Sequence, residues 1–292
     1  MLDDLLELDA LTKLAGQVVA AGFLVFFEVQ YYSLQLPGGD EQVALDTTQA
    51  AIATVVVVVA TVNAVNFVDG LDGLAAGVVG LGGVAFFLFS YQLADANGET
   101  LAISAALLTA ALGGVCAGFL PHNFFPARIF MGDSGSMLIG LVLSGSALTL
   151  TSQFASVDLR QGIGGGEASL LPTLLPIILP IAILVVPFAD LVLAVVRRTR
   201  AGRSPFAPDK QHLHHRLLEI GHSHRRAVLI MWLWAALIAF GGVLASLYSS
   251  TTTTLVLVGW VLLTIVLTFF VPRVHRPGRV PSAPDPAAAP DG

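Results

Sequence analysis

The sequence predicts an all-α fold, a polytopic integral-membrane helix bundle with about eight transmembrane helices. Hydrophobic residues make up 55% of the 292 residues and charged residues 12%, about half the charged share of a typical soluble domain. The mean hydropathy is +0.81, and the apolar residues form runs that reach the ~20 residues needed to cross a bilayer. Lipid is therefore the expected solvent for most of the protein surface.

Eight apolar runs meet that length. In order, they are residues 14–36, 47–65, 74–94, 101–120, 136–154, 171–196, 227–248 and 253–271. The second contains the valines 55–59, which locally favour a strand, but an open strand edge in hydrocarbon leaves backbone groups unsatisfied, so we expect a helix. The sixth contains four prolines and should be kinked. We assign residues 1–272 to one membrane-embedded domain and the Pro/Ala-rich residues 273–292 to a disordered cytoplasmic tail.

The basic residues predict the orientation of these helices. Of the fourteen Lys and Arg residues, eight lie in the segment 197–226, and the connections on the same side contain five more. Only Arg160 falls on the opposite side. Since positive charge is retained on the cytoplasmic side, we expect a multi-pass protein of the plasma membrane whose four polar motifs all lie at the cytoplasmic face.

The first of these motifs is the pair Asp3 and Asp4. Adjacent carboxylates at a membrane surface can hold Mg²⁺, or one can act as a base while the other orients it. A solvated acidic segment without a site function is the alternative interpretation.

The second motif, NAVNFVDGLDG at residues 63–73, spaces its polar residues three apart. These residues are Asn63, Asn66, Asp69 and Asp72. On a continuing helix they would lie along one stripe, while Gly70 and Gly73 allow the helix to break and the backbone to approach a ligand. A helix cap followed by a turn is the structural alternative.

The third motif, FMGDSGS at residues 130–136, places Asp133 between glycines directly before an apolar run. Backbone amides at a helix start favour phosphate, and Asp133 is suited to ligate a metal that bridges to it. N-capping by Asp133 or Ser134 is the alternative.

The fourth motif, DKQHLHHRLL at residues 209–218, is basic and rich in histidine. His212, His214, His215 and Arg216 offer hydrogen-bond donors and a positive field for a diphosphate. The histidine spacing also suits zinc, although no cysteine or separate ligand pair accompanies it. A basic membrane-surface loop without a site role is a further alternative.

Several carboxylates at one membrane depth indicate a bound cation and a phosphate, because ionised groups are costly near hydrocarbon. The leading hypothesis is therefore a membrane enzyme acting on an anionic substrate. A cation-coupled transporter is the rival from another class, but its carboxylates should lie in mid-span near broken helices. Here they lie at helix ends on one side. No nucleic-acid partner is expected.

Together, LDDLLELDALTKLAGQ, NAVNFVDGLDGLAAG, FMGDSGS and DKQHLHHRLLEIG closely resemble the polyprenyl-phosphate N-acetylhexosamine-1-phosphate transferases, which form glycosyltransferase family 4. The histidine motif has a leucine where the branch using UDP-MurNAc-pentapeptide has a third consecutive histidine. The chain is therefore more similar to the branch that transfers GlcNAc-1-phosphate from UDP-GlcNAc to undecaprenyl or decaprenyl phosphate. Members of that branch have about eleven spans, so about three N-terminal spans are expected to be missing here. A non-catalytic truncated relative is accordingly the remaining alternative.

The resemblance implies a mechanism in which the lipid phosphate attacks the β-phosphorus of the nucleotide sugar and UMP leaves, either directly or through a phospho-aspartate. Mg²⁺ is the implied cofactor, with Mn²⁺ as a substitute and Asp133 as its ligand. Asp3 or Asp4 would deprotonate or position the lipid phosphate, and Lys13 would neutralise it. The asparagines and aspartates of the second motif would bind uridine, metal or phosphate. The histidines and Arg216 would bind the sugar or the diphosphate. A homodimer is left open.

Overall fold

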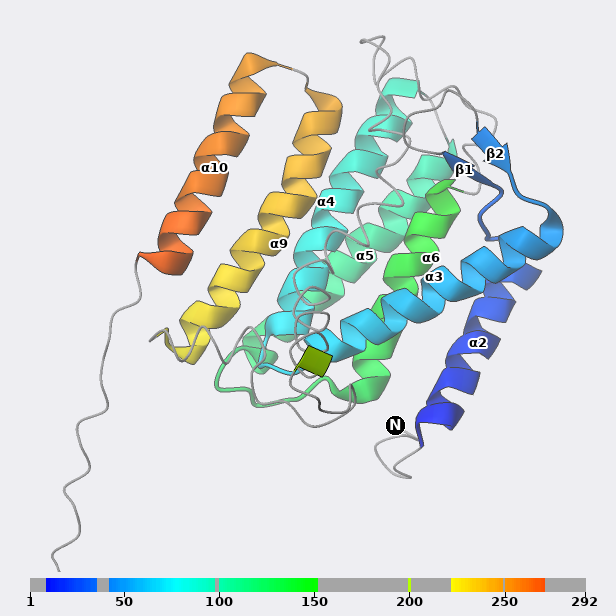
Figure 1. Cartoon of the computed structure of the whole chain (residues 1–292), viewed down its shortest axis with the longest axis horizontal. Helices are drawn as coiled ribbons and strands as arrows, with labels where there is room; N and C mark the ends of the chain where they lie inside the picture. The colour runs from blue at the N-terminus through cyan, green and yellow to red at the C-terminus, as the bar shows by residue number, and fades with distance from the viewer. Residues whose placement is uncertain are drawn as a thin grey trace, which may run out of the picture.

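The structure is a computed structural model that describes residues 9–35, 42–97, 100–151, 199–200, 222–248 and 250–270 (Figure 1). In chain order its elements are α2 (Ala10–Phe26), β1 (Ser33–Gln35), β2 (Gln42–Ala44), α3 (Thr47–Val68), α4 (Leu74–Asn97), α5 (Thr100–Asn123), α6 (Gly132–Thr151), α9 (His224–Leu247) and α10 (Thr251–Phe269). Among the described residues, six helices are long and apolar enough to cross a membrane, namely α3 to α6, α9 and α10. The predicted helical, multi-pass architecture is confirmed. The proline-rich span 171–196 and the tail 273–292 lie outside the described residues.

The prediction of a first span over residues 14–36 is wrong in its second half. Helix α2 has 17 residues and ends at Phe26. Glu28 takes a left-handed conformation with φ of 61°. The amides of Glu28 and Val29 then donate to the carbonyls of Val25 and Leu24, at 3.0 and 2.8 Å. This pair of bonds is the Schellman motif, which usually relies on glycine at the left-handed position. Because a glutamate occupies that position here, the sequence gives no obvious stop signal.

A short antiparallel ribbon, which the sequence did not predict, follows this turn. Strand β1 pairs with β2 in a register that places Leu34 opposite Val43. The ribbon returns the chain to α3, whose N-cap is Asp46 in a capping box with Gln49. Helix α3 then runs unbroken through the valines 55–59. The prediction that this run is helical rather than extended is therefore confirmed.

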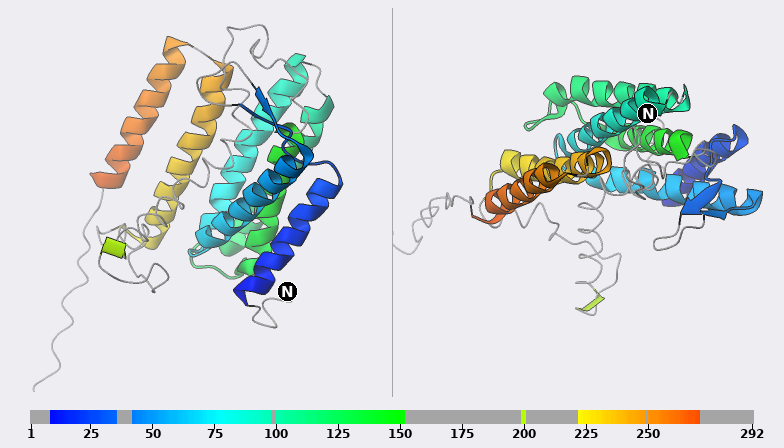
Figure 2. Two further views of the ribbon diagram at one scale, coloured as in Figure 1. Left: turned by 45° about the vertical axis from the view of Figure 1, so that its right-hand side comes forward. Right: turned by 90° about the horizontal axis from the view of Figure 1, so that it is seen from above.

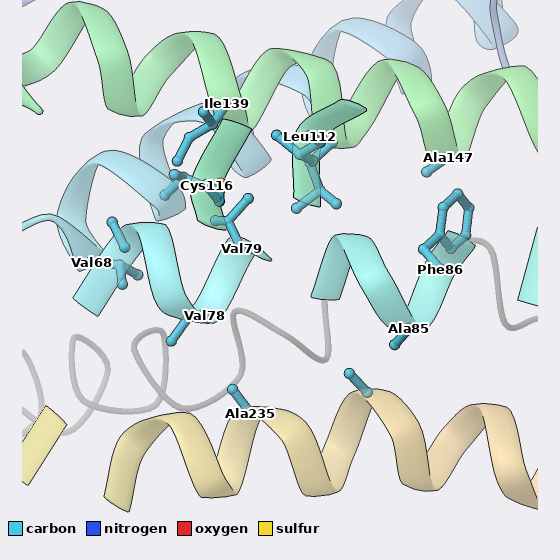
Figure 3. Close-up of a cluster of buried hydrophobic side chains, with 14 of the residues drawn as sticks. Val68, Val78, Val79, Ala85, Phe86, Leu112, Cys116, Ile139, Ala147 and Ala235 are labelled. Carbon is cyan, nitrogen blue, oxygen red and sulfur yellow. The ribbon is translucent and has the colours of Figure 1, made fainter. Parts of the chain in front are cut away.

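Helix α4 is the centre of the bundle and packs against α5, α6 and α9. Its glycines allow the neighbouring helices to approach closely, as is usual where lipid provides no hydrophobic drive for association. A Cβ at Gly80 would lie 2.9 Å from the Cβ of Cys116 on α5. Buried side chains from α3, α4, α5, α6 and α9 complete this core, with Phe86, Val79 and Leu112 among them (Figure 3).

Helices α3 and α6 form the second close contact, and this contact aligns the site. A Cβ at Gly140 of α6 would lie 2.9 Å from the Cα of Val62 on α3. Helix α2 packs on the outer side of α3, and α9 pairs with α10 at the opposite edge of the bundle (Figure 2). Among the spans that the structure describes, α10 is the least enclosed, with 11% of its apolar window buried against 72% for α4. Lipid is therefore the expected neighbour of most of α10.

Candidate active site

The alternating direction of the described helices brings the carboxyl ends of α3, α5 and α10 and the amino ends of α2, α4, α6 and α9 to one end of the bundle (Figure 1). The α3–α4 turn (residues 69–73) and the α5–α6 loop (residues 124–131) therefore lie side by side. The predicted convergence of motifs at one end is confirmed for the second and third motifs.

The α3–α4 turn breaks the predicted stripe of polar residues. Helix α3 ends at Val68, and Asp69 is its C-cap. Gly73 has a φ of 77°, a conformation that strongly favours glycine. Only Asn63 and Asn66 therefore lie on α3, while Asp69 and Asp72 belong to the turn. The interpretation of the glycines as a helix break is confirmed, and the continuous helical stripe is wrong.

Asn123, at the end of α5, ties the turn to the loop. Its side chain is 3% exposed. The Oδ1 atom accepts from the amide of Gly73 at 3.0 Å, and Nδ2 donates to the carbonyl of Ile129 at 3.0 Å. A second link runs from the amide of Ala127 to Oδ2 of Asp72, also at 3.0 Å. These side-chain hydrogen bonds thus hold the α3–α4 turn against the α5–α6 loop.

Asp133 lies in the first turn of α6 and meets side chains from two other helices. Lys13 of α2 donates to its Oδ2 at 2.5 Å. Asn66 of α3 donates to its Oδ1 at 3.2 Å and to Oγ of Ser136 at 2.9 Å. Three residues predicted from separate stretches of sequence (Lys13, Asn66 and Asp133) therefore meet directly.

Asn63 lies one turn farther from this end and pairs with Gln17 of α2. The Asn63 amide donates to Oε1 of Gln17 at 2.6 Å, and the Gln17 amide donates back at 3.4 Å. Asn63 lines neither of the two pockets at the site. Its contacts join two helices, and its predicted substrate-binding role stays a prediction.

A polar pocket of about 270 Å³ opens between the α3–α4 turn and the α5–α6 loop. Its lining consists of Asp69, Gly70, Leu71, Asp72, Asn123, Phe130, Met131, Gly132 and Asp133. Burial, followed by the charges of Asp133 and Asp72, raises the pKa of Asp69 to about 6. Three carboxylates thus share one pocket, and their mutual repulsion favours a bound cation.

An apolar groove of about 310 Å³ adjoins this pocket between α2, α3 and α6. Its lining consists of Thr12, Lys13, Gly16, Gln17, Ala20, Val62, Ser134, Met137, Leu138 and Leu141. Lys13 belongs to the groove and Asp133 to the polar pocket, so their ion pair marks the junction of the two. The sequence did not single out Asn123, Gln17 or Phe130 as lining residues. Phe130 is 75% exposed, and the sequence of the third motif does not show that its aromatic residue is exposed at the rim of a pocket.

The donors in the polar pocket fit Mg²⁺. Although three carboxylates line this pocket, no three His, Cys, Asp or Glu side chains in the described part of the chain lie close enough together to hold one metal ion among them. Mg²⁺ does not require such a cage, because it is usually held by one or two carboxylates together with waters and substrate phosphates. Asp133, Asp69 and Asp72 offer hard carboxylate oxygens of that kind. Asp3, Asp4, His212, His214, His215 and Arg216, which were also predicted for the site, lie outside the described residues.

Comparison with known proteins gives a family match and several similar proteins. The family model described as glycosyl transferase family 4 matches residues 1–151, more than half of the chain. The decaprenyl-phosphate N-acetylglucosaminephosphotransferase of Mycobacterium tuberculosis (strain ATCC 25618 / H37Rv) is 46% identical over 278 residues, which are 94% of this chain and 67% of that protein. The Mycolicibacterium smegmatis protein of the same name is 45% identical with the same coverage. A probable undecaprenyl-phosphate N-acetylglucosaminyl 1-phosphate transferase of Bacillus subtilis is 38% identical over 53% of this chain and 36% of its own length.

Proposed function

Because the chain belongs to glycosyl transferase family 4, we propose that it transfers GlcNAc-1-phosphate from UDP-GlcNAc to a polyprenyl phosphate and releases UMP. Relatives that align with 94% of the chain are named for this transfer to decaprenyl phosphate. A decaprenyl acceptor is therefore the first choice, with undecaprenyl phosphate as the second. The lipid-linked product would initiate synthesis of a cell-envelope glycopolymer.

The observation that carries this proposal is the junction of a polar pocket with an apolar groove. The reaction joins a water-soluble nucleotide sugar to a phosphate at the end of an isoprenoid chain. The polar pocket suits the first substrate and the groove suits the first isoprene units of the second. The two phosphates would meet where Lys13 pairs with Asp133, at 2.5 Å.

Each charged residue at the junction has a separate task. Bound Mg²⁺ would neutralise the diphosphate and polarise its phosphorus–oxygen bonds. Asp133 and Asp69 would hold that cation. Asn66 fixes the carboxylate of Asp133 by donating to it, and Lys13 would exchange its bond to Asp133 for one to the lipid phosphate. A phosphate monoester dianion is already a competent nucleophile, so we favour direct attack over a phospho-aspartate.

Residues beyond the junction complete the proposed site. Phe130 offers an exposed ring at the rim of the polar pocket, where the uracil base of the donor can stack. Asp3 or Asp4 would orient the lipid phosphate, and the histidines of the fourth motif with Arg216 would bind the sugar or diphosphate. The site would face the cytoplasm at the plasma membrane, because the basic residues gather on that side.

The direct test is UMP release by the purified full-length chain in detergent, supplied with UDP-GlcNAc, decaprenyl phosphate and Mg²⁺. We expect Asp133→Ala to lower kcat/KM by about 100-fold or more, the scale of losing a group that stabilises transition-state charge. Asp133→Asn keeps the size of the side chain and should fail similarly. Asp95→Ala, an exposed carboxylate at the far end of α4, is the matched control and should retain activity. If Asp133→Ala turned over at the wild-type rate, the proposed role of Asp133 as a metal ligand would be wrong.

A donor screen separates the branches of the family. UDP-GlcNAc is expected to release UMP faster than UDP-GalNAc or UDP-MurNAc-pentapeptide. Faster release of UMP from UDP-MurNAc-pentapeptide would instead assign the chain to the branch that uses this donor. Absence of UMP with every donor and both acceptors would favour a non-catalytic relative. Removing Mg²⁺ with EDTA should abolish release, and Mn²⁺ should restore part of it.

A further inference from the structure

The amino-terminal part of α9 contacts both connections that form the polar pocket. Arg225 donates from Nε to the carbonyl of Phe125 at 3.1 Å. The imidazole of His224 stacks on the ring of Phe125, with centroids 4.4 Å apart and planes 25° apart. Both contacts therefore hold the α5–α6 loop near its beginning.

Two turns farther along, α9 also contacts the α3–α4 turn. Nε1 of Trp232 donates to the carbonyl of Gly73 at 3.1 Å, and its ring lies 5.5 Å from that of Phe124. A Cβ at Gly77 would lie 1.9 Å from Trp232, so the indole fits against bare backbone of α4. Arg225 and Trp232 are seven residues apart and thus share one face of the helix.

None of these α9 residues lines the polar pocket. The loop that they hold supplies Phe130 and Met131 to the pocket and leads directly into Asp133. A loop needs several ties to keep such side chains in place, because fixing each backbone residue costs conformational entropy. Asn123 and Asp72 provide two of these ties from inside the pocket, and α9 provides another from outside.

We propose that Arg225 is a positioning residue for the transferase reaction, which with the His224 stack clamps the α5–α6 loop and so holds Phe130 and Asp133 around the donor. The inference rests on the proposed function. It assigns to the start of α9 a task in donor binding, although Arg225 does not line the polar pocket.

The neighbouring Arg226 provides a matched control. It lies in the same first turn of α9, is exposed, and carries the same charge. Its backbone amide donates to Oγ of Ser223 at 3.4 Å, and within the described part of the chain its guanidinium makes no hydrogen bond to the α5–α6 loop. Arg225→Ala and Arg226→Ala therefore remove equal charge from one place, while only the first removes the bond to Phe125.

The experiment combines hydrogen exchange with kinetics on the full chain in detergent. The amides of Ala127, Arg128 and Ile129 are hydrogen bonded within the site, so their exchange reports opening of the loop. We expect Arg225→Ala to speed exchange over residues 124–131 and to raise the KM for UDP-GlcNAc about five- to tenfold, the effect of losing one hydrogen bond. The change in kcat should be smaller, and the melting temperature should match that of Arg226→Ala. Arg225→Lys, which can still donate to the carbonyl, should restore part of the KM.

Three outcomes would overturn the proposal. Equal exchange of the loop in both alanine variants would show that Arg225 does not hold it. Faster exchange spread over all helices, with a lower melting temperature, would show a general structural role instead. Faster exchange of the loop with an unchanged KM would separate the clamp from donor binding. If the wild-type chain releases no UMP, the proposed function fails, while exchange and binding of UDP-GlcNAc still decide whether the clamp acts on the donor pocket.

Discussion

Replacing Asn123 by alanine should weaken the fold and the site together. Its side chain is 3% exposed and bonds two backbone groups that belong to different connections, the amide of Gly73 and the carbonyl of Ile129. Alanine satisfies neither group. The turn that carries Asp69 and Asp72 and the loop that leads to Asp133 would then lose their common tie.

The size of the effect follows from the surroundings of the two bonds. Gly73 is buried, so its amide would be left without a partner, at a cost of about 1–3 kcal/mol. Ile129 is 52% exposed, so water can replace the bond to its carbonyl and the loss should be about 0.5–1.5 kcal/mol. Asn123→Ala should therefore lower the free energy of unfolding by roughly 2–4 kcal/mol.

Unfolding in mixed micelles titrated with SDS, followed by helix circular dichroism, measures this difference. Thr109→Val is the matched control. Thr109 is also a buried polar residue of α5, but its hydroxyl donates to Ala105 and Ala106 carbonyls of the same helix. Its loss leaves no backbone amide unpaired, and the change should stay within about 0.5 kcal/mol.

UMP release should fall with stability in Asn123→Ala and remain near wild type in Thr109→Val. If the two variants unfold at the same SDS fraction, the reasoning that Asn123 satisfies two connections is refuted. A stable Asn123→Ala with no activity would instead assign the residue to substrate contact alone.

Three further predictions concern single residues at the site. The pKa of Asp69 is raised from 3.8 to about 6, so the protonated carboxyl stabilises the cation-free fold below about pH 4, and this stabilisation is lost as the pH rises through about 6. The melting temperature in EDTA should therefore fall over that pH range, and the fall should be smaller in Asp69→Asn. Gly140→Ala should lower activity and melting temperature because its Cβ meets the α3 backbone at 2.9 Å, whereas Gly145→Ala, in the same helix with nothing within 4 Å of the added Cβ, should be neutral or stabilising; equal effects would contradict the close-contact argument. Asp72→Asn retains an oxygen that can accept from the Ala127 amide and should keep the melting temperature while weakening Mg²⁺-dependent UMP release, and a large loss of stability would show that the charge itself holds the loop.

The sequence by itself determined the membrane-helix class and the chemistry of the motifs. Runs of ~20 apolar residues have one stable form in lipid, because every backbone group must be bonded within the segment. That rule correctly predicted that the valines 55–59 are helical in spite of their preference for strands. Because successive membrane helices run in opposite directions, the order of the spans placed the second and third motifs at one end of the bundle, which the contacts of Asp133 confirm.

Tertiary structure alone decided which of those groups touch and what surrounds them. The pairing of Asn63 with Gln17 and the tie made by Asn123 both depend on contacts between segments far apart in the chain. Helical periodicity tells which residues share a face of one helix, but not the rotation or depth at which that helix meets its neighbours. Those are set by close packing at small residues such as Gly140 and Gly80, where the backbones approach until side chains stop them.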